Sequence, residues 1–472
     1  MIAPATVKPA EGLRFEGSGV VIVGAGAAGL CAALRVAEVN VRVVVIERDR
    51  LAAGSTALSA GLIPAAGTRF QRAKGIADSA HLFAEDISAK AHGEAVPSLV
   101  RVVSEGAAPT VEWLADAYGF PFEIIDNFNY PGHSAFRMHG LPSRSGAELI
   151  DRLRTAAEQG EIPILTNSAV TTLFAEADGR ISGVACRRGD AEQLIGCDAL
   201  ILACNGFGGN RQLVERYIPE IAEAIYFGHV GNQGDAIRWG QQLGADIRCL
   251  SAYQGHGSVA TPHNVLITWA CISEGGFQVN REGRRFSNEA LGYSEHAAEV
   301  MQQPDGIAYE IFDERIADIA RQFPDFRDAE KAGALFGTTT IEELARLLNI
   351  PAAALATEFE EIARTMQRGA PDRFGRSFQS QSELTPPYRA IKVTGALFHT
   401  QGGLMITPET RVVRPDGVPF PNLFAAGGAA VGVSGNSASG YLSGNGLLTA
   451  IVFGRLAGER AAEVARDPCP PR

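Results

Sequence analysis

A glycine-rich turn between two short apolar runs constrains the fold of this chain more than any other feature. Val20–Val23 (VVIV) predicts a buried strand, GAGAAG follows directly, and a helical pattern then extends to residue 39. A second apolar run, residues 41–46, ends at Glu47. A strand, glycine turn, helix, second strand and acid in about 28 residues are typical of a βαβ unit that binds a dinucleotide.

Each residue type in this turn has a physical purpose. Gly24 permits the tight turn, Gly26 lets the backbone approach a pyrophosphate, and Gly29 lets helix and strand pack closely. The helix N-terminus offers N–H groups and the positive end of its dipole to the phosphates. Glu47 can accept hydrogen bonds from ribose hydroxyls and would repel a 2′-phosphate. The alternative is a parallel-sheet turn that binds nothing.

Composition narrows the class of protein. At about 150 residues per domain, 472 residues allow roughly three domain-sized units and a large core without disulfide or metal support. The net charge of −11 argues against a nucleic-acid or anionic-membrane partner. A hydrophobic content of 46% with 20% charged residues excludes a disordered chain. We therefore expect a globular enzyme.

The cysteines and the long uncharged windows exclude other classes. Seven cysteines occur without CxxC or Cys/His ligand spacing, so no zinc, iron–sulfur or attached haem site is predicted. An odd number of cysteines and the lack of an export signal in the first residues indicate a cytoplasmic protein. Residues 17–34 and 422–454 are uncharged but interrupted by glycine turns, so neither is predicted to span a membrane.

The amino-acid composition changes twice along the chain. From about Ser251, aromatic, Pro and His residues precede helical segments of mixed charge, and after Gln401 the glycine richness returns. We therefore predict a discontinuous dinucleotide-binding domain, residues 1–251 and 399–472, with residues 252–398 inserted as a capping domain that contacts substrate.

Several segments along the chain resemble one family, the FAD-dependent oxidoreductases of the fumarate reductase/succinate dehydrogenase flavoprotein group. They are GAGAAGL with Glu47, GSTALSAG, LACNGFGGN, NQGDAIRWG, VNREGRRFSNE, HTQGG, NLFAAGGAA and GNGLLTAIVFGRLAG. The resemblance implies an α/β fold: a Rossmann-like FAD-binding domain, discontinuous in sequence, with an inserted α+β capping domain. The GSTALSAG and C-terminal glycine segments favour FAD over a nicotinamide dinucleotide. Members with covalent FAD carry a histidine where this chain has STALS, so noncovalent FAD is expected.

The resemblance also implies which residues contact FAD. They are Gly24, Ala25, Gly26, Ala28 and Gly29 at the pyrophosphate; Glu47 and Arg48 near the ribose; Ser55, Thr56, Ser59, Ala60 and Gly61 by the pyrophosphate and flavin ring; Val170 near the adenine; Asn205, Gly206 and Asp235 along the cofactor; and Gly428, Ser443, Asn445 and Leu447 near the flavin pyrimidine.

The charged positions of the fumarate reductase branch are replaced in this chain. The Arg–Glu–Arg proton relay of that branch corresponds to Tyr293, Trp269 and Ile272, and a substrate-binding Arg corresponds to Tyr441. A small dianion would lose its hydration in such surroundings without compensation. Fumarate or succinate chemistry is therefore not expected.

The two tyrosines instead resemble the 3-ketosteroid dehydrogenase branch, with a Tyr-x-Ser spacing closer to the Δ4-(5α) type. That likeness implies that Tyr293 takes a proton beside a ketone, and that Tyr441, with a backbone N–H near Ser443, stabilises the ketone oxygen. Because the reference pKa of tyrosine is about 10, His296 one turn on is a candidate relay. The substrate-binding candidates are His256, Trp269, His399, Tyr130 and Arg137.

The function indicated is flavin-dependent α,β-desaturation of a cyclic ketone, such as a 3-ketosteroid or an oxo-cyclohexane compound. An ene-reductase that runs the same steps backwards is the first alternative, and a flavin-bound sensor without catalysis is the second. With no haem or iron–sulfur motif present, the electron acceptor is expected to be external: a quinone, dioxygen or a redox protein.

Overall fold

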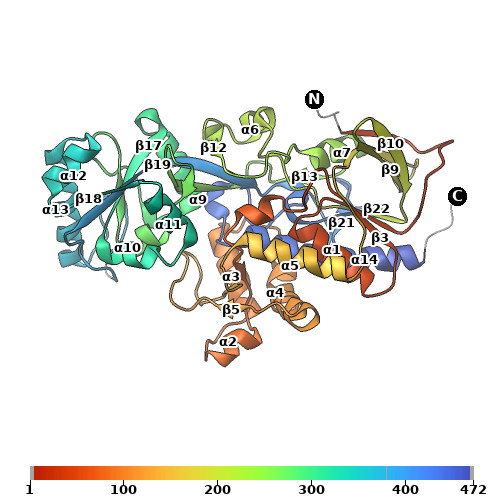
Figure 1. Ribbon diagram of the computed structural model, residues 1–472, viewed down its shortest axis with the longest axis horizontal. Coiled ribbons are helices and arrows are strands. Elements are labelled where there is room, and N and C mark those ends of the chain that lie inside the picture. Colours follow the sequence, from red (N-terminus) through yellow and green to blue (C-terminus); the bar gives the residue numbers. More distant parts are fainter. Residues whose placement is uncertain (1–4, 379, 468–472) are drawn as a thin grey trace. The chain divides into compact units, whose positions relative to one another are not determined.

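The computed structural model describes residues 5–378 and 380–467. The chain separates into two units (Figure 1). Unit 1 comprises Met1–Tyr217, Gly228–Tyr253 and His399–Arg472, and unit 2 comprises Ile218–Phe227 and Gln254–Phe398. Unit 2 thus includes residues 218–227, which lie outside the cap predicted at 252–398.

Unit 1 is built on a six-stranded sheet with the order β21-β22-β11-β2-β3-β7. β2, β3, β7, β11 and β22 run parallel, and β21 pairs antiparallel with β22 at one edge. Every residue of β2 and β11 is buried, which explains their uninterrupted apolar sequences VVIV and ALIL. The bounds are β2 Val20–Val23, β3 Val43–Ile46, β7 Ile164–Leu165, β11 Ala199–Leu202, β21 Arg411–Val413 and β22 Pro419–Ala425.

Helices and smaller sheets complete unit 1. One four-stranded sheet has the order β1-β8-β9-β10, a three-stranded sheet has the order β4-β6-β5, and β13 pairs with β20. The strands are β1 Thr6–Pro9, β4 Ile63–Pro64, β5 Glu123–Ile124, β6 Met138–Gly140, β8 Ala169–Ala175, β9 Ile181–Arg188, β10 Ala191–Gly196, β13 Ile247–Arg248 and β20 Gly403–Leu404. The helices are α1 Ala27–Ala37, α2 Arg69–Ala73, α3 Ala80–Lys90, α4 Pro97–Tyr118, α5 Gly146–Gln159, α6 Arg211–Tyr217, α7 Asp235–Leu243 and α14 Asn445–Arg466.

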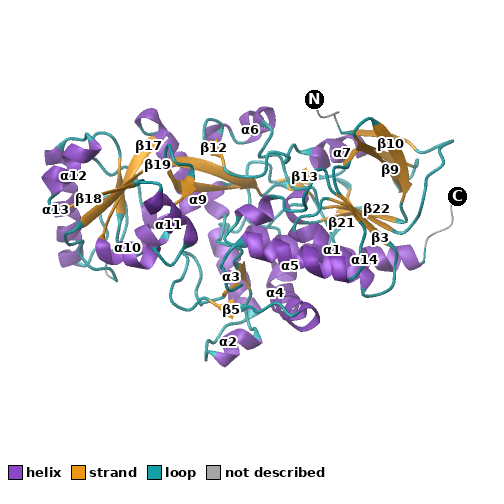
Figure 2. Ribbon diagram, viewed as in Figure 1, coloured by secondary structure: helices purple, strands orange, loops and turns teal. Residues whose placement is uncertain are grey.

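Unit 2 is an α+β unit around a sheet with the order β15-β14-β19-β17-β16, in which β12 and β18 also pair with β19 (Figure 2). Its strands are β12 Ile225–Tyr226, β14 Tyr253–Ala260, β15 Val265–Leu266, β16 Phe277–Val279, β17 Ile307–Asp313, β18 Leu335–Thr338 and β19 Tyr388–Thr400. Its helices are α8 Ala270–Ser273, α9 Tyr293–Met301, α10 Glu314–Ala320, α11 Pro324–Lys331, α12 Ile341–Leu348 and α13 Ala352–Arg368. The predicted mixed α/β fold class is confirmed.

Two general features concern the described part of the chain. Every helix there is too short or too polar to cross a bilayer. Within the same residues, no group of three or more His, Cys, Asp or Glu side chains is arranged to hold a metal ion.

The helices α1 and α14 lie against each other through small residues (Figure 1). A Cβ atom built at Gly454 would lie 2.3 Å from the carbonyl oxygen of Ala28, and one at Gly458 would lie 2.3 Å from that of Ala32. Glycine is therefore required at both positions for the two backbones to approach so closely.

We predict that Gly458→Ala lowers the free energy of unfolding by about 1–3 kcal/mol, because the added methyl group overpacks the contact with α1. In an open helix the same change would instead stabilise by about 1 kcal/mol. Urea unfolding followed by circular dichroism measures the difference, with the exposed Glu463→Ala as the control on the same helix. A variant as stable as the control would contradict the close contact.

Candidate active site

The turn after β2 is shaped by three glycines that differ in their surroundings. Gly24 has φ +105°, and a Cβ atom there would lie 2.5 Å from the carbonyl oxygen of Ala203. A Cβ atom at Gly29 would lie 1.9 Å from the carbonyl oxygen of Gly24. At Gly26, by contrast, the nearest atom is Thr56 Oγ1 at 3.6 Å. Two glycines thus permit close packing, and Gly26 leaves an open surface at the start of α1.

Glu47 lies directly against this turn. It is buried, and its Oε2 accepts from the Ala25 N–H at 2.8 Å while its Oε1 accepts from the Asp49 N–H at 3.0 Å. Each carboxylate oxygen can accept a further hydrogen bond, so the same side chain can hold both the turn and a ribose hydroxyl. Arg48 instead donates to the carbonyl of Gly231 at 2.7 Å and pairs with Asp235 in the first turn of α7.

The loop at residues 54–61 packs on the same turn. Thr56 Oγ1 accepts from the Ala27 N–H at 3.0 Å. Ser55 Oγ accepts from the amide of Asn232 at 2.9 Å and from that of Asn205 at 3.3 Å. Asn232 was missed by the sequence analysis, since no local pattern marks it.

The remaining predicted flavin contacts of unit 1 are placed as follows. Asn205 has φ +64°, and Cβ atoms built at its neighbours Gly206 and Gly428 would lie 2.0 Å from Thr400 Oγ1 and 2.1 Å from Asn205 Oδ1. Ser59 donates to the Thr56 carbonyl at 2.8 Å and accepts from the Gly61 N–H at 3.2 Å, with Ala60 between them. Val170 lies buried in β8. Ala28 lies in the first turn of α1, and Leu447 in the first turn of α14.

The first turn of α14 offers a second cofactor-binding feature. Its N-cap is Gly444, which supplies no side chain to the helix's first N–H groups. Asn445 is buried, yet its Oδ1 has no hydrogen-bond partner. A buried acceptor of this kind normally has a partner, and a ring N–H of a bound flavin would supply one. The open surface at Gly26 and the unpaired oxygen of Asn445 both fit a flavin dinucleotide.

Tyr441 lies next to the first turn of α14 in unit 1. Its hydroxyl oxygen accepts from the Gly446 N–H at 3.4 Å, and its ring packs edge-on against His399 at 5.6 Å. His399 is held by Gln401 at 3.0 Å, and Gln401 contacts Ser434 at 2.9 Å. Burial raises the pKa of Tyr441 and lowers that of His399 to about 4. At neutral pH, therefore, the phenol keeps its proton and the imidazole is uncharged.

Ser443 is fixed by a residue that the sequence analysis did not select. His133 Nε2 lies 3.0 Å from the carbonyl oxygen of Ser443, so the imidazole N–H donates to it. His133 is buried, and burial lowers its pKa to about 4. Its position in the HSAFRMHG segment gave no local signal for this contact, which joins residues 310 positions apart.

The predicted substrate role of Arg137 requires a correction. The side chain is completely buried and donates to Asp78 at 3.0 and 3.1 Å and to Asp86 at 2.5 Å. Two carboxylates already satisfy this guanidinium, so it stabilises unit 1 and does not bind a substrate carboxylate. Tyr130 packs edge-on against Phe128 at 4.8 Å.

A second cluster of predicted residues lies in unit 2. The rings of Tyr293 and His256 stack at 4.8 Å with an interplanar angle of 23°. Trp269 lies edge-on to His256 at 5.6 Å and to Tyr293 at 6.2 Å. Burial lowers the pKa of His256 to about 3, so its ring is neutral at physiological pH. The two rings that pack on Tyr293 therefore carry no charge.

The structure places the predicted relay residue His296 between two polar side chains. Its Nδ1 lies 3.0 Å from Ser287 Oγ and its Nε2 lies 2.9 Å from Gln278 Oε1. A neutral imidazole has one donor and one acceptor, and these two bonds use both. Burial lowers the pKa of His296 to about 4, so the ring is neutral at pH 7 and is held by a polar side chain at each nitrogen.

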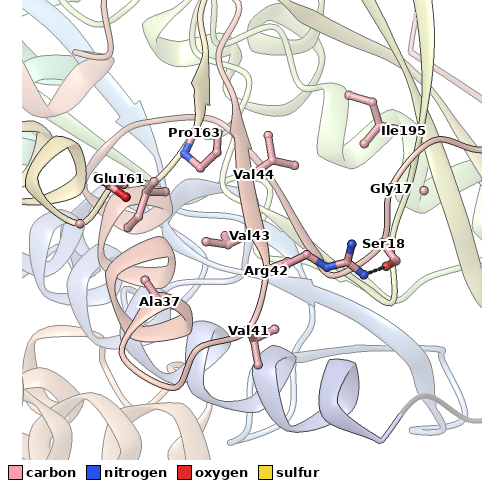
Figure 3. Close-up of a pocket in the computed structure, with 13 residues that line it drawn as sticks. Gly17, Ser18, Ala37, Val41, Arg42, Val43, Val44, Glu161, Pro163 and Ile195 are labelled. Atoms are coloured by element: carbon pink, nitrogen blue, oxygen red, sulfur yellow. Dashed lines mark hydrogen bonds between the residues drawn. The ribbon is translucent and has the colours of Figure 1, made fainter.

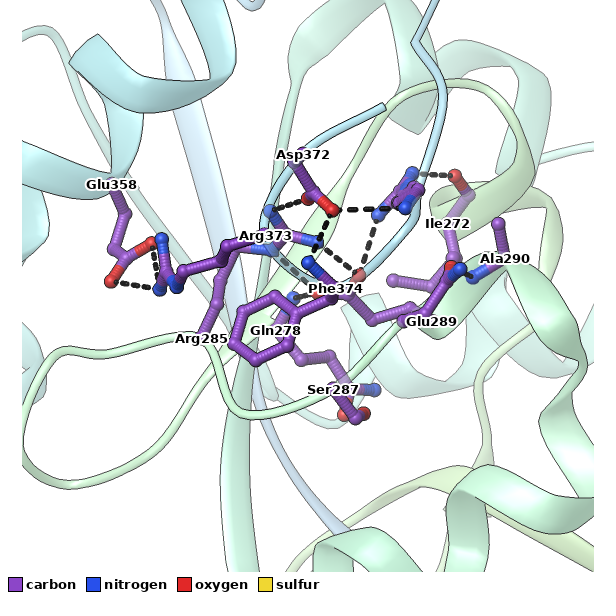
Figure 4. Close-up of polar contacts among 12 residues, drawn as sticks. Ile272, Gln278, Arg285, Ser287, Glu289, Ala290, Glu358, Asp372, Arg373 and Phe374 are labelled. Carbon is purple, nitrogen blue, oxygen red and sulfur yellow. Dashed lines mark hydrogen bonds and ion pairs between the residues drawn. The ribbon is translucent and has the colours of Figure 1, made fainter. Parts of the chain in front are cut away.

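Four buried charges brace this cluster from within unit 2 (Figure 4). Arg285 donates to Glu289 at 2.7 and 2.9 Å and to Asp372 at 2.6 Å. Arg376 donates to Glu289 at 3.0 Å and to the carbonyls of Ile272 and Gly276, both at 2.9 Å. Arg376 and Asp372 were missed from sequence. The network joins the end of α8 to the segment that precedes α9, the helix that begins with Tyr293.

A depression in unit 1 lies away from this turn (Figure 3). Its volume is about 490 Å³, and its lining includes Val41, Val43 and Ile195, with Arg42 bonded to Ser18. These residues lie at the amino ends of β2, β3 and β7, whereas dinucleotides bind at the carboxyl ends of parallel strands. This depression is therefore not the flavin site.

Comparison with known proteins agrees with this geometry. A family model described as "FAD binding domain" matches residues 19–447. The chain belongs to this FAD-binding family. It is 31% identical over 472 residues to the urocanate reductase of Eggerthella lenta, covering 96% of this chain and 76% of that protein. It is 29% identical over 457 residues to the probable fumarate reductase Ifc3 of Shewanella frigidimarina, with the same two coverages.

Two solved structures resemble the whole chain. A flavocytochrome c3 fumarate reductase in its open conformation superposes with a TM-score of 0.79 at 27% identity, over 98% of this chain and 79% of that one. The 3-ketosteroid-Δ4-(5α)-dehydrogenase of Rhodococcus jostii RHA1, in complex with 4-androstene-3,17-dione, superposes with a TM-score of 0.78 at 25% identity, over 98% of this chain and 100% of that one. The chain is therefore an FAD-dependent oxidoreductase that acts on CH–CH or C=C bonds.

We predict that Glu47→Gln weakens FAD binding roughly 10- to 100-fold. One backbone N–H donor would then face the N–H group of the amide in place of an oxygen acceptor, which costs about 1–3 kcal/mol of binding free energy. Titration of apoprotein with FAD, followed by flavin fluorescence, measures the dissociation constant. The exposed Glu192→Gln is the matched control in the same unit. Equal affinity in both variants would mean that the turn does not depend on Glu47.

A second prediction concerns Glu289. Burial alone would raise its pKa, but Arg285 and Arg376 outweigh burial and hold the pKa well below its usual range. The resulting stability is present above the unfolded-state pKa of about 4.3 and is lost as the pH falls below it.

Glu289→Gln should therefore cost about 3–5 kcal/mol of unfolding free energy at pH 7, with a gap to wild type that narrows only as the pH falls below about 4. Urea unfolding at several pH values measures this, and the exposed Glu360→Gln is the control. A gap that stays constant with pH would contradict the ionic origin of the stability.

Proposed function

We propose that this enzyme desaturates a cyclic ketone, such as a 3-ketosteroid or an oxo-cyclohexane compound, next to its carbonyl group. The observation that carries the proposal is the pair Tyr293 and Tyr441, each held in a buried cluster of aromatic and neutral histidine side chains. A neutral phenol suits a ketone oxygen and a phenolate suits an acidic C–H, whereas a small dicarboxylate requires cations.

Tyr441 is suited to hold the ketone oxygen. Burial raises its pKa, so the phenol keeps its proton and can donate it. Its oxygen accepts the Gly446 N–H, and a phenol that accepts a hydrogen bond becomes a stronger donor. As negative charge develops on the ketone oxygen, this hydrogen bond strengthens and makes the neighbouring C–H more acidic. His399 packs on the ring and restricts its orientation.

Tyr293, as its phenolate, is the proposed acceptor of the C–H proton, and the transfer leaves it as a neutral phenol. The stacked ring of His256 and the edge of Trp269 fix its orientation, and neither carries charge at neutral pH. FAD, when bound, supplies the acceptor for the hydride from the adjacent carbon. The electrons then pass to an external acceptor, which we infer to be a quinone, dioxygen or a redox protein.

An ene-reductase is the second candidate, and the named relatives favour it. The similar sequences include reductases of fumarate and of urocanate, which act on C=C bonds. The same tyrosines would then serve in reverse, with Tyr293 as the proton donor. The uncharged clusters favour an enone over a dicarboxylate as its substrate.

We also infer a reducing, cytoplasmic setting. The cysteines of the described residues, which number six, are free thiols. Disulfides are rare in such compartments, so unpaired cysteines are expected there.

We predict that Tyr441→Phe lowers the rate of flavin reduction about 10²–10³-fold and Tyr293→Phe about 10²–10⁴-fold, with FAD retained in both. Oxidised enzyme is mixed anaerobically with 3-ketosteroids, cyclohexanones and 4-oxocyclohexane acids, and the visible flavin band is followed. Tyr309→Phe, a buried tyrosine on β17, is the matched control.

The outcomes separate the alternatives. Bleaching by one class of ketone, lost in the two tyrosine variants and kept in the control, supports the proposal. Full activity in either variant would remove that tyrosine from the mechanism. If no ketone bleaches the flavin but matching enones reoxidise reduced enzyme, the protein is an ene-reductase.

A further inference from the structure

Glu310 is a buried carboxyl in unit 2 that the proposed mechanism does not use. It lies on β17 with no exposed surface. Its Oε2 accepts from Ser258 Oγ at 2.6 Å and from Gln278 Nε2 at 2.9 Å. Its Oε1 has no hydrogen-bond donor in bonding geometry, and the Cys271 thiol is a polar neighbour of the carboxyl. A buried carboxyl group with hydrogen-bond donors at only one of its two oxygens is better suited to hold a proton than to be ionised.

Two polar connections lead from this carboxyl to the neighbours of Tyr293. The Ser258 N–H donates to His256 Nδ1 at 3.1 Å, and the His256 ring stacks on Tyr293. The second connection is formed by Gln278, whose Oε1 accepts from His296 at 2.9 Å. His296 in turn lies 5.5 Å from Trp269, ring to ring.

We propose that Glu310 is a positioning residue for the proposed reaction. Through Ser258 and Gln278 this buried carboxyl holds the histidines that lie against Tyr293 and Trp269, and loss of its proton adds a negative charge to that cluster. The proposal rests on the proposed role of Tyr293. A negative charge there opposes formation of a phenolate, so the neutral acid is the form that favours proton removal from a ketone.

Among the ionisable groups around Glu310, only Glu310 itself is expected to change charge near neutral pH. The groups that act on Glu310 are Ser258 on β14, Cys271 on α8, Gln278 on β16 and Glu289 on the segment before α9, with the apolar Ile391 opposite on β19. His256 on β14 and His296 on α9 are connected to it through Ser258 and Gln278. Burial keeps both histidines neutral and the thiol protonated, and the two arginines keep Glu289 ionised. Burial raises the pKa of Glu310 to about 7.

Three variants of the FAD-bound enzyme test the proposal. Glu310→Gln keeps an acceptor for Ser258 and Gln278 but cannot titrate, and Glu310→Ala removes the acceptor. Asp313→Asn is the matched control: Asp313 is a buried carboxyl on the same strand that caps α10 through the Ile316 N–H at 3.0 Å.

The first readout is the pH profile of flavin reduction by the ketone that bleaches the wild type. We expect an inflection near pH 7 in the wild type and in Asp313→Asn, and none in Glu310→Gln. Glu310→Ala should lose up to about 100-fold in kcat with KM little changed, the effect of a misplaced proton acceptor. A wild-type pH profile in Glu310→Gln, or a wild-type kcat in Glu310→Ala, would overturn the proposal.

The second readout needs no substrate. The folded-state pKa of Glu310 lies above its unfolded value, so its contribution to stability is present below the unfolded pKa and is lost as the pH rises through about 7. The Tm of Glu310→Gln relative to wild type should therefore increase between pH 5 and pH 9, while that of Asp313→Asn should not. A constant difference for Glu310→Gln would overturn the proton-holding role, even if Glu310→Ala fails to fold.

Failure of the proposed function gives a different pattern. If no ketone bleaches wild-type flavin, the proposed function fails and the Tm measurement alone judges Glu310. If ketones bleach the flavin with unchanged rates and pH profiles in the Glu310 variants, the proposed function stands and the role of Glu310 fails.

Discussion

The cofactor site depends on a very close backbone approach in unit 1. The missing Cβ at Gly29 lets α1 lie against the turn that carries the Gly24 carbonyl. This contact aims the N-terminus of α1 at the space beside Gly26, and Gly454 and Gly458 let α14 lie along the other side of the helix. The absence of side chains at these glycines thus determines where backbone N–H groups can bind phosphate and how the core of unit 1 packs around them.

Unit 2 handles charge in a different way. It gathers Arg285, Glu289, Asp372 and Arg376 into a closed network, which offers no unbalanced charge to a ligand. The rings that pack on Tyr293 carry no charge, since burial suppresses protonation of His256. Keeping the ionic network apart from these rings suits the ketone substrate that we propose, because a further charge beside Tyr293 would shift its protonation.

Sequence reasoning succeeded where the signal was local. The glycine turn, the buried strand β2 and the acid after β3 follow from spacing within about 28 residues. It failed where a partner lies far along the chain. Arg137 forms ion pairs with Asp78 and Asp86, which lie more than fifty positions earlier in the sequence. His133 donates a hydrogen bond to Ser443, 310 positions later. No periodicity encodes such pairs, because tertiary contact alone brings them together.

The two units interrupt each other along the chain, and this order has a consequence for biosynthesis. The central strand β11 pairs with β22, which is synthesised about 220 residues later, and α1 packs on α14, which follows β22. A ribosome therefore delivers all of unit 2 before the flavin-binding sheet can close. Until then the strands that are synthesised first, β2, β3, β7 and β11, have an unpaired apolar edge. Chaperones would shield this edge from aggregation.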